Sequence, residues 1–156
     1  MKKNRWQPYV GFIILSEAVG LLAGVLTRNA MPAYDALLKP SLTPPDLAFP
    51  IAWGVLYLLM GIGAARIYQT DAPGRKKALA VFGVQLAVNF AWSLIFFNLQ
   101  AFGFSFFWLL LLLSLILWMI ALFWKLDRPA ALLQIPYLLW VSFAGYLNYA
   151  IWHLNG

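Results

Sequence analysis

The feature that most constrains this chain is a set of five apolar stretches, each long enough to cross a lipid bilayer. Only 10% of the residues are charged, whereas a soluble domain has about 25%, so the chain lacks the polar surface that it would need in water. A membrane-spanning helix needs roughly 20 apolar residues, and 156 residues allow five of them with short loops. The sequence therefore predicts an all-α membrane protein, a five-transmembrane-helix bundle that forms one domain over residues 1–156.

The boundaries of the spans follow from the turn-forming residues between the apolar runs. The connections after the second, third and fourth spans are short, so these spans should pack as antiparallel neighbours. The first connection, residues 28–43, is longer, and we expect it to lie as a lid across one end of the bundle. Thr43 as N-cap, Pro44 in the first turn and Asp46 near the start predict where the second helix begins. The spans are expected at about residues 9–27, 44–68, 77–98, 104–124 and 129–153.

Basic residues at the ends of the spans predict the orientation in the membrane. With five spans the termini lie on opposite sides, and Lys and Arg collect on the cytoplasmic side. The lid side has only Arg28 and Lys39, so we expect the N-terminus inside and the C-terminus outside. A basic leader can also belong to a signal peptide, but Glu17 interrupts the run that follows, which favours an uncleaved span. The other side has Lys2, Lys3, Arg5, Arg66, Arg75, Lys76, Lys77, Lys125 and Arg128.

The residue inventory excludes several classes of function. The chain has no cysteine and a single histidine, His153, so thiol catalysis, a His-based triad and a Cys/His metal cluster cannot be assembled. Neither paired carboxylates nor a glycine-rich phosphate loop occurs, which excludes an ordinary hydrolase or ATPase. The net charge of +6 comes from bases at span ends rather than from a patch, so no nucleic acid partner is expected. No metal and no cofactor is expected either.

The third span has a polar stripe and, nearly opposite, a ridge of small residues. Gln85, Asn89 and Ser93 recur at i, i+4 and i+8, which places them on one helix face. Amides are costly in hydrocarbon and face protein or a cavity, so they either hold two helices together or contact a ligand. Small residues at this spacing permit close approach of another helix, from the same chain or from a second copy. The ridge consists of Gly83, Ala87 and Ala91.

Aromatic side chains recur at helical spacing in the second and fifth spans. Trp53 and Tyr57 lie one turn apart, and Tyr137, Trp140 and Ala144 share a face. Such stripes commonly serve packing, but both tryptophans lie well inside their spans rather than at the membrane interface only. Facing indole rings beside a few amides would suit a large, flat, apolar ligand with limited polar decoration.

Two features interrupt the apolar pattern of the spans. Glu17 is the only acid deep within one, and an intramembrane carboxyl indicates a proton or cation site, although a hydrogen-bonded structural role is equally compatible. Pro136 removes a backbone hydrogen bond to residue 132 and should kink the fifth helix just before Trp140. The first span also carries a second small-residue ridge, formed by Ser16, Gly20 and Gly24.

Three segments of the chain carry a recognisable combination of residues. The first is Tyr34-x-x-Leu37-x-Lys39-Pro40-x-x-x-Pro44-Pro45, followed by Trp53; the second is Gln85-x-x-x-Asn89-x-x-Trp92-Ser93-x-x-Phe96-Phe97; the third is Pro136-Tyr137-x-x-Trp140-x-x-Phe143-Ala144-x-Tyr146-Leu147-Asn148. In this order and over nearly the whole chain, they resemble the TspO/MBR family, the tryptophan-rich sensory proteins related to the mitochondrial translocator protein.

The resemblance implies a five-helix bundle, usually homodimeric, whose ligand pocket is closed by the loop between the first two helices. It implies a multi-pass protein of a bacterial cell membrane that binds and senses protoporphyrin IX or a related tetrapyrrole, and that accepts synthetic isoquinoline or benzodiazepine ligands. Together with the stripes above, it predicts a dimer contact on the ridge of the third span. The predicted ligand-binding residues are Tyr34, Lys39, Trp53, Tyr57, Asn89, Ser93, Tyr137, Trp140 and Ala144.

Two alternative functions follow from the same resemblance. One is light-dependent degradation of protoporphyrin IX, in which Trp53 and Trp140 would be the catalytic residues. The other is transport of porphyrins or other apolar ligands, in which Glu17 would be the coupling group. Five short spans without an inverted repeat or a broken helix pair argue against a secondary transporter.

The chain also departs from the family pattern. Ala33 and Leu42 stand where the family often has tryptophan, so a less aromatic lid is expected. The cholesterol motif of animal members needs Lys or Arg after Leu147-x-Tyr149, and none follows, so no cholesterol site is expected.

Overall fold

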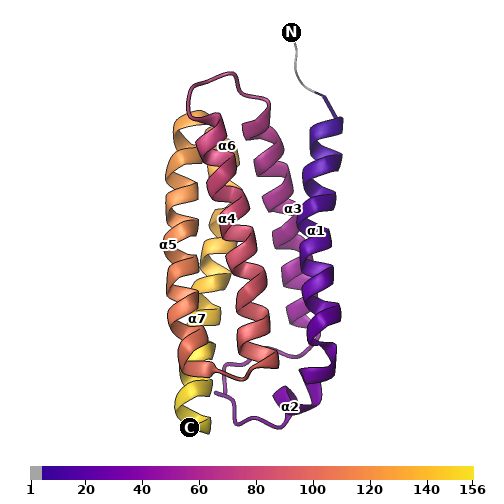
Figure 1. Ribbon diagram of the computed structural model, residues 1–156, viewed down its shortest axis with the longest axis vertical. Helices are drawn as coiled ribbons and strands as arrows, with labels where there is room; N and C mark the ends of the chain where they lie inside the picture. Colours follow the sequence, from indigo (N-terminus) through magenta and orange to yellow (C-terminus); the bar gives the residue numbers. More distant parts are fainter. Residues whose placement is uncertain (1–4) are drawn as a thin grey trace.

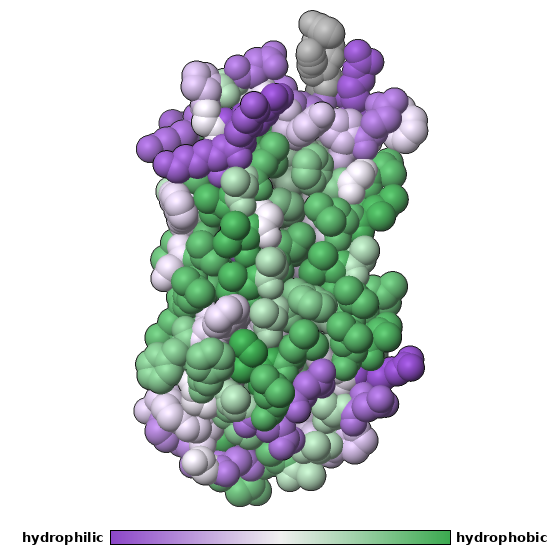
Figure 2. Space-filling view, in the orientation of Figure 1, coloured by the Kyte–Doolittle hydropathy of each residue, from purple (hydrophilic) through white to green (hydrophobic). Residues whose placement is uncertain are grey.

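The computed structural model describes residues 5–156 and shows a bundle of long helical spans (Figure 1). Within these residues, five spans are long and apolar enough to cross a membrane. Apolar side chains cover the middle of the visible face, and polar ones gather at both ends (Figure 2). The predicted all-α, five-span fold is confirmed, and the protein is an integral, multi-pass membrane protein.

The elements lie close to the predicted spans. The first span continues from α1 through the 3-10 turn η1 and the short helix α2, and the third ends in the π-helical turn η2. Helix α1 packs against α3 and α4, α4 against α5, and α5 against α6 and α7. The elements are α1 (Gln7–Thr27), η1 (Arg28–Ala30), α2 (Met31–Asp35), α3 (Ala48–Tyr68), α4 (Arg75–Ser93), η2 (Leu94–Asn98), α5 (Phe102–Leu126), α6 (Arg128–Leu132) and α7 (Ile135–Asn155).

The predicted start of the second span was wrong. Helix α3 begins at Ala48 and has no side-chain cap, while the Thr43 hydroxyl donates a hydrogen bond to the carbonyl of Pro40, at 2.8 Å. The reason is the Pro44-Pro45 pair, because a residue that precedes proline is pushed out of the helical region. The first part of the lid is helical and consists of η1 and α2.

The fifth span is interrupted earlier than predicted. The chain leaves the helical path between α6 and α7, and Pro136 lies in the first turn of α7, where its missing N–H has no helical partner to lose. The fully buried Gln134 at this break donates from Nε2 to the carbonyls of Leu59 and Ala130, both at 3.3 Å. The kink expected just before Trp140 is therefore a break one turn earlier.

Glycines let α1 and α3 approach closely at the end of the bundle away from the lid and in its middle. A Cβ on Gly61 would lie 2.6 Å from the Ile13 Cα, and one on Gly20 would lie 2.3 Å from the Tyr57 ring. On the predicted ridge of α1, Gly20 makes this contact, whereas a Cβ on Gly24 would meet nothing within 4 Å. The two helices thus touch away from the lid and leave space towards it.

The start of α1 and the C-terminus lie at opposite ends of the bundle, and the lid lies at the C-terminal end (Figure 1). Helices α4 and α6 begin at the other end, where Arg75 and Arg128 are their first residues. The predicted segregation of charge is therefore present along the bundle, except that Lys2 and Lys3 lie outside the described residues. Which end faces the cytoplasm stays a prediction.

Candidate ligand-binding site

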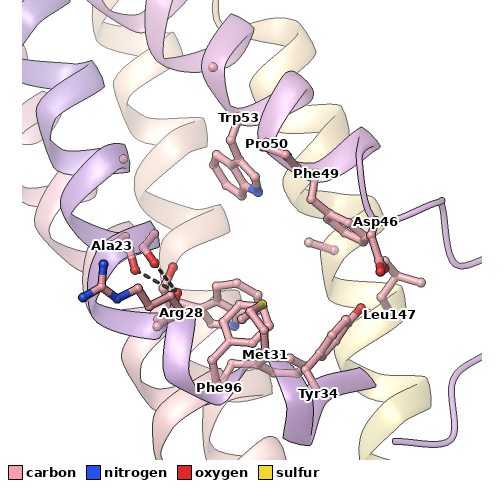
Figure 3. Close-up of a pocket in the computed structure, with 18 of the residues that line it drawn as sticks. Ala23, Arg28, Met31, Tyr34, Asp46, Phe49, Pro50, Trp53, Phe96 and Leu147 are labelled. Carbon is pink, nitrogen blue, oxygen red and sulfur yellow. Dashed lines mark hydrogen bonds between the residues drawn. The ribbon is translucent and has the colours of Figure 1, made fainter. Parts of the chain in front are cut away.

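A cavity of about 710 Å³ lies at the lid end of the bundle. Residues of α1, α3, α4 and α7 form its walls, and residues of the lid close it (Figure 3). Small-molecule sites in proteins have volumes of roughly 300–1,000 Å³. The cavity is therefore large enough for a polycyclic ligand.

Six of the nine predicted ligand-binding residues line this cavity. They come from the lid and from three different helices, so the fold brings together positions that are far apart in the sequence. The six are Tyr34, Trp53, Tyr57, Ser93, Trp140 and Ala144. The other three are Lys39, Asn89 and Tyr137, and each has a contact elsewhere.

Aromatic rings form the wall of the cavity furthest from the lid. Trp53 points into the open space (Figure 3), with its ring centroid 5.5 Å from that of Tyr57 and 6.3 Å from that of Tyr137. On α7, Trp140 meets Phe49 edge to face at 6.0 Å. Rings held by such neighbours present fixed apolar faces to a ligand.

Tyr34 closes the cavity from the lid side, where it projects from α2 towards the open space (Figure 3). Its ring lies 5.3 Å from Phe97 and 6.3 Å from Phe96, centroid to centroid. A π-helical turn holds an extra residue and shifts the phase of the side chains that follow it. The π turn η2 therefore lets two consecutive phenylalanines support the same tyrosine.

The polar stripe of α4 serves mainly as a link between helices. The Tyr57 hydroxyl donates to Asn89 Oδ1 at 3.2 Å, and Asn89 Nδ2 donates to the Tyr137 hydroxyl at 2.8 Å. That hydroxyl in turn donates to Gln85 Oε1 at 2.6 Å. Asn89 and Tyr137 are only 2% and 0% exposed, so this chain of hydrogen bonds joins α3, α4 and α7 behind the cavity wall. Within the stripe, only Ser93 lines the cavity.

Lys39 closes the end of the short lid helix instead of facing the cavity. Its ammonium donates to the carbonyls of Tyr34, Asp35 and Leu37, at 3.0, 3.2 and 3.2 Å. The nitrogen also lies 4.8 Å from the centroid of the Tyr34 ring. An ammonium has three donors, and all three are used here, so Lys39 positions Tyr34 rather than offering a free charge.

Several residues line the cavity that were not among the predicted ligand contacts. Glu17 on α1 lines it, as do the acids Asp35 and Asp46 at the lid. Among residues 5–156, Arg28 is the only Lys or Arg on the lining, and its guanidinium points away from the open space (Figure 3). Sequence spacing did not place α1 in the wall because small and aliphatic residues such as Gly24 carry no distinctive signal.

Asn148 also lines the cavity, and both sides of its amide are satisfied by neighbours. Its Oδ1 accepts from Trp92 Nε1 at 3.0 Å and from the Ser105 hydroxyl at 3.1 Å. Its Nδ2 donates to the carbonyl of Phe102 at 2.9 Å. Asn148 therefore ties α7 to α4 and α5 at the lid end and fixes the Trp92 ring.

The small-residue ridge of α4 faces away from the other helices. Gly83 and Ala87 are exposed and Ala91 is half-buried, and a Cβ on Gly83 would meet nothing within 4 Å. Within residues 5–156, the ridge therefore does not serve an intrachain neighbour, which was one of its two predicted uses.

Comparison with known proteins gives a consistent assignment. The TspO/MBR family model matches residues 12–153. The chain is 42% identical to protein CrtK of Rhodobacter capsulatus, over 92% of this chain and 90% of that protein. It is 36% identical to the translocator protein of Bos taurus, over 96% and 91%, and 35% identical to the tryptophan-rich sensory protein of Cereibacter sphaeroides, over 96% and 92%. These matches cover the helices and the lid that form the cavity, and the protein belongs to the TspO/MBR family.

Proposed function

We propose that this protein binds a tetrapyrrole, such as protoporphyrin IX or a haem-pathway intermediate, in the lid-end cavity and acts as a membrane sensor of that ligand. The observation that carries the proposal is a cavity of about 710 Å³ with the rings of Trp53 and Trp140 on its walls. A flat aromatic macrocycle gains both apolar burial and ring stacking in such a site. The name of the relative from Cereibacter sphaeroides, a tryptophan-rich sensory protein, supports the sensory part. A bacterial cell membrane is the proposed location.

The proposed pose places the ring between the two tryptophans and the propionates at the lid. Lys39 was the predicted partner of a propionate, but its ammonium already donates to three carbonyls. Arg28 at the rim of the cavity is the better partner, because a guanidinium binds a carboxylate with two parallel hydrogen bonds. Its exposed side chain points outward (Figure 3), so it would have to turn towards the propionate. The carboxylates would then stay at the wet edge of the membrane.

Ligand binding in detergent tests the proposal. Protoporphyrin IX should quench tryptophan fluorescence, and Trp53→Phe and Trp140→Phe should each weaken binding about 2- to 10-fold, since an aromatic pair contributes about 0.5–1.5 kcal/mol. Trp118→Phe is the matched control, because Trp118 lies exposed on α5 and does not line the cavity. Unchanged affinity in both pocket variants would refute the assignment of the site.

Light-dependent degradation of the bound porphyrin is a second candidate. The observation that favours it is the set of aromatic neighbours of Trp53, whose ring lies 5.5 Å from Tyr57 and 6.3 Å from Tyr137. In this candidate reaction Trp53 would give an electron to the excited porphyrin, and the reduced porphyrin would react with molecular oxygen as the oxidant. A neighbouring tyrosine would then return an electron to the Trp53 radical. Illumination with and without oxygen tests it: a distinct product should form, and bleaching only at the rate of free porphyrin would exclude the activity.

We also propose that the outward ridge of α4 is the contact between two copies of the chain. Its support is the exposure of Gly83 and Ala87 on a helix that should cross lipid, since small residues allow two backbones to approach closely. The natural chain has no cysteine, so Ala87→Cys introduces a single thiol. Oxidative cross-linking to a covalent dimer is expected for Ala87→Cys, and not for Leu117→Cys on the exposed side of α5.

A further inference from the structure

Glu17 is a carboxyl without a partner on the wall of an otherwise largely apolar cavity. It lies near the middle of the helical span Gln7–Asp35 and lines the cavity. Within residues 5–156, it forms no ion pair and no hydrogen bond. Leaving a carboxyl at this depth without a partner is costly, so a partner supplied by the ligand would stabilise the complex.

The neighbours of Glu17 cannot supply that partner. Gly20, one turn further along α1, packs on the Tyr57 ring, but the Tyr57 hydroxyl already donates to Asn89. Arg28 lies three turns away, roughly 16 Å along the helix axis, and its guanidinium points away from the cavity (Figure 3). Within residues 5–156, no side chain pairs with Glu17, so its carboxyl is available to a group of a bound molecule.

The other charged groups of the lining point to the sign of that molecule's charge. The acids Asp35 and Asp46 line the cavity at the lid end. Within residues 5–156, Arg28 is the one basic residue that lines it. Three acids and one base line the space, and the guanidinium of the base points away from it (Figure 3). At the buried end of the cavity, a positively charged group would be attracted to Glu17.

We propose that Glu17 makes the cavity selective for a flat apolar ligand that carries a basic nitrogen, an ammonium or amidinium group, at its buried end. The aromatic body would lie against Trp53 and Trp140, and the nitrogen would donate a charge-assisted hydrogen bond to the Glu17 carboxylate. Such a bond is about twice as strong as a neutral one, and it strengthens where water is excluded. The inference concerns the same cavity as the proposed function, but it does not require the ligand to be a tetrapyrrole.

Three probes that share one ring system test this selectivity. They are 1-pyrenemethylamine, 1-pyrenemethanol and 1-pyrenecarboxylic acid, titrated into the full chain in a neutral maltoside detergent and followed by energy transfer from tryptophan to pyrene. Protein-free micelles measure partitioning into detergent. The wild-type protein should bind the amine at least about tenfold more tightly than the alcohol, since a hydrogen bond to a charged group contributes about 1.5–3 kcal/mol. The acid should bind more weakly than the alcohol.

Glu17→Gln should abolish the preference for the amine and leave the affinity for the alcohol within about twofold. Retained alcohol binding shows that the variant is folded, and Glu17→Ala is a second variant that removes the same carboxyl. Asp46→Asn is the matched control at the rim: any effect there should disappear in 0.5 M salt, where the screening length is about 4 Å. The effect of Glu17 should persist.

Two results would overturn the inference. One is an equal preference for the amine in the wild-type protein and in both Glu17 variants, and the other is no preference in the wild-type protein while the alcohol binds. Neither result touches the tetrapyrrole proposal, which depends on protoporphyrin IX and the tryptophan variants. Conversely, a protein that selects the amine through Glu17 but does not bind protoporphyrin IX would refute the proposed function alone.

Discussion

The hydroxyl of Tyr137 joins the amide nitrogen of Asn89 to the amide oxygen of Gln85, and both atoms would otherwise be buried without a partner. It accepts from Asn89 Nδ2 and donates to Gln85 Oε1, and these three side chains come from α4 and α7. A hydroxyl can donate and accept at the same time, which is why a tyrosine rather than a phenylalanine suits this position. The group therefore matters for the stability of the bundle and less for direct contact with a ligand.

Tyr137→Phe should lower stability without a comparable loss of ligand affinity. The change leaves one buried donor and one buried acceptor unsatisfied, which costs about 1–3 kcal/mol, whereas the Tyr137 side chain does not line the cavity. Thermal unfolding in detergent and protoporphyrin IX titration measure the two effects. Tyr149→Phe, at a ring that is 47% exposed, is the control and should change neither; a loss of affinity with unchanged stability in Tyr137→Phe would contradict this interpretation.

Two glycines of α3 should respond oppositely to alanine. A Cβ on Gly61 would lie 2.6 Å from the backbone of Ile13, whereas one on Gly54 would meet nothing within 4 Å. Gly61→Ala should therefore destabilise the protein by about 1–3 kcal/mol through overpacking. Gly54→Ala should be neutral or stabilising by up to about 1 kcal/mol, because alanine favours the helix. Equal unfolding temperatures in detergent would argue against the close approach of α1 and α3.

Spacing along the sequence predicted which faces of the helices point into the bundle, but not which group each side chain contacts there. Trp53, Trp140 and Ser93 line the cavity, whereas Asn89 on the same stripe as Ser93 bonds to tyrosines behind the wall. The difference is one turn of helix, and it depends on the tilt of neighbouring helices, which no pattern within one span specifies. Lys39 was assigned to the ligand for its charge, but no helix was predicted within residues 28–43, so the carbonyls at the end of α2 were not foreseeable as its partners.

At the level of elements, the lid is fastened to the end of α7 by one side chain. The Asn155 amide accepts from the Leu38 N–H at 3.0 Å and donates to the Leu38 carbonyl at 2.8 Å. Asn155 thereby pairs with the backbone as a neighbouring strand would. Since α2 carries Tyr34, this attachment also helps to hold the aromatic cover over the cavity.

Asn155→Ala should accelerate release of a bound ligand by roughly tenfold, because two hydrogen bonds of about 0.5–1.5 kcal/mol each are lost. Stopped-flow displacement of protoporphyrin IX or of a pyrene probe measures the rate. Ser142→Ala is the control, since the Ser142 hydroxyl bonds only to Leu138 within α7. An unchanged release rate would mean that the lid does not limit ligand exit.

The ends of elements were the least predictable part of the fold. Capping residues at 43–46 suggested a helix start, but consecutive prolines delayed it to Ala48, and Pro136 was compatible with both a kink and a helix start. At residues 43–46 a capping pattern competed with the restriction that proline imposes on the residue before it, and at Pro136 a helix kink competed with a helix start. Contacts with the rest of the bundle decided both cases. The buried Gln134, which satisfies carbonyls at the break, has no signal in the sequence that distinguishes it from a surface glutamine.

At the scale of the whole molecule, the low charge content and the lengths of the apolar runs were sufficient to predict five spans, because each run is long enough to cross the hydrocarbon core of a bilayer. The asymmetry of charge predicts the orientation in the same way. Basic residues outnumber acids at the end away from the lid, and the single ion pair in the described chain, between Arg66 and Asp127 at 2.6 Å, neutralises only one of them.

The orientation can be tested directly, since a chain without cysteine accepts single cysteines as reporters. Ser41→Cys in the lid should react with a membrane-impermeant maleimide in intact cells, because the lid is expected outside. Asp71→Cys, between α3 and α4, should react only after permeabilisation. The reverse pattern would show that the distribution of Lys and Arg does not determine the topology here.

The unequal packing of α1 and α3 should let these helices separate at the lid end only. They are in close contact at Gly61 and Ile13, whereas a Cβ on Gly24 or Gly54 would meet nothing within 4 Å. A thicker ligand should therefore move the two helices apart at the lid and hardly move the opposite end. Ligand size would be converted into a displacement on one side of the membrane only, which spin labels at the two ends of α1 and α3 could measure.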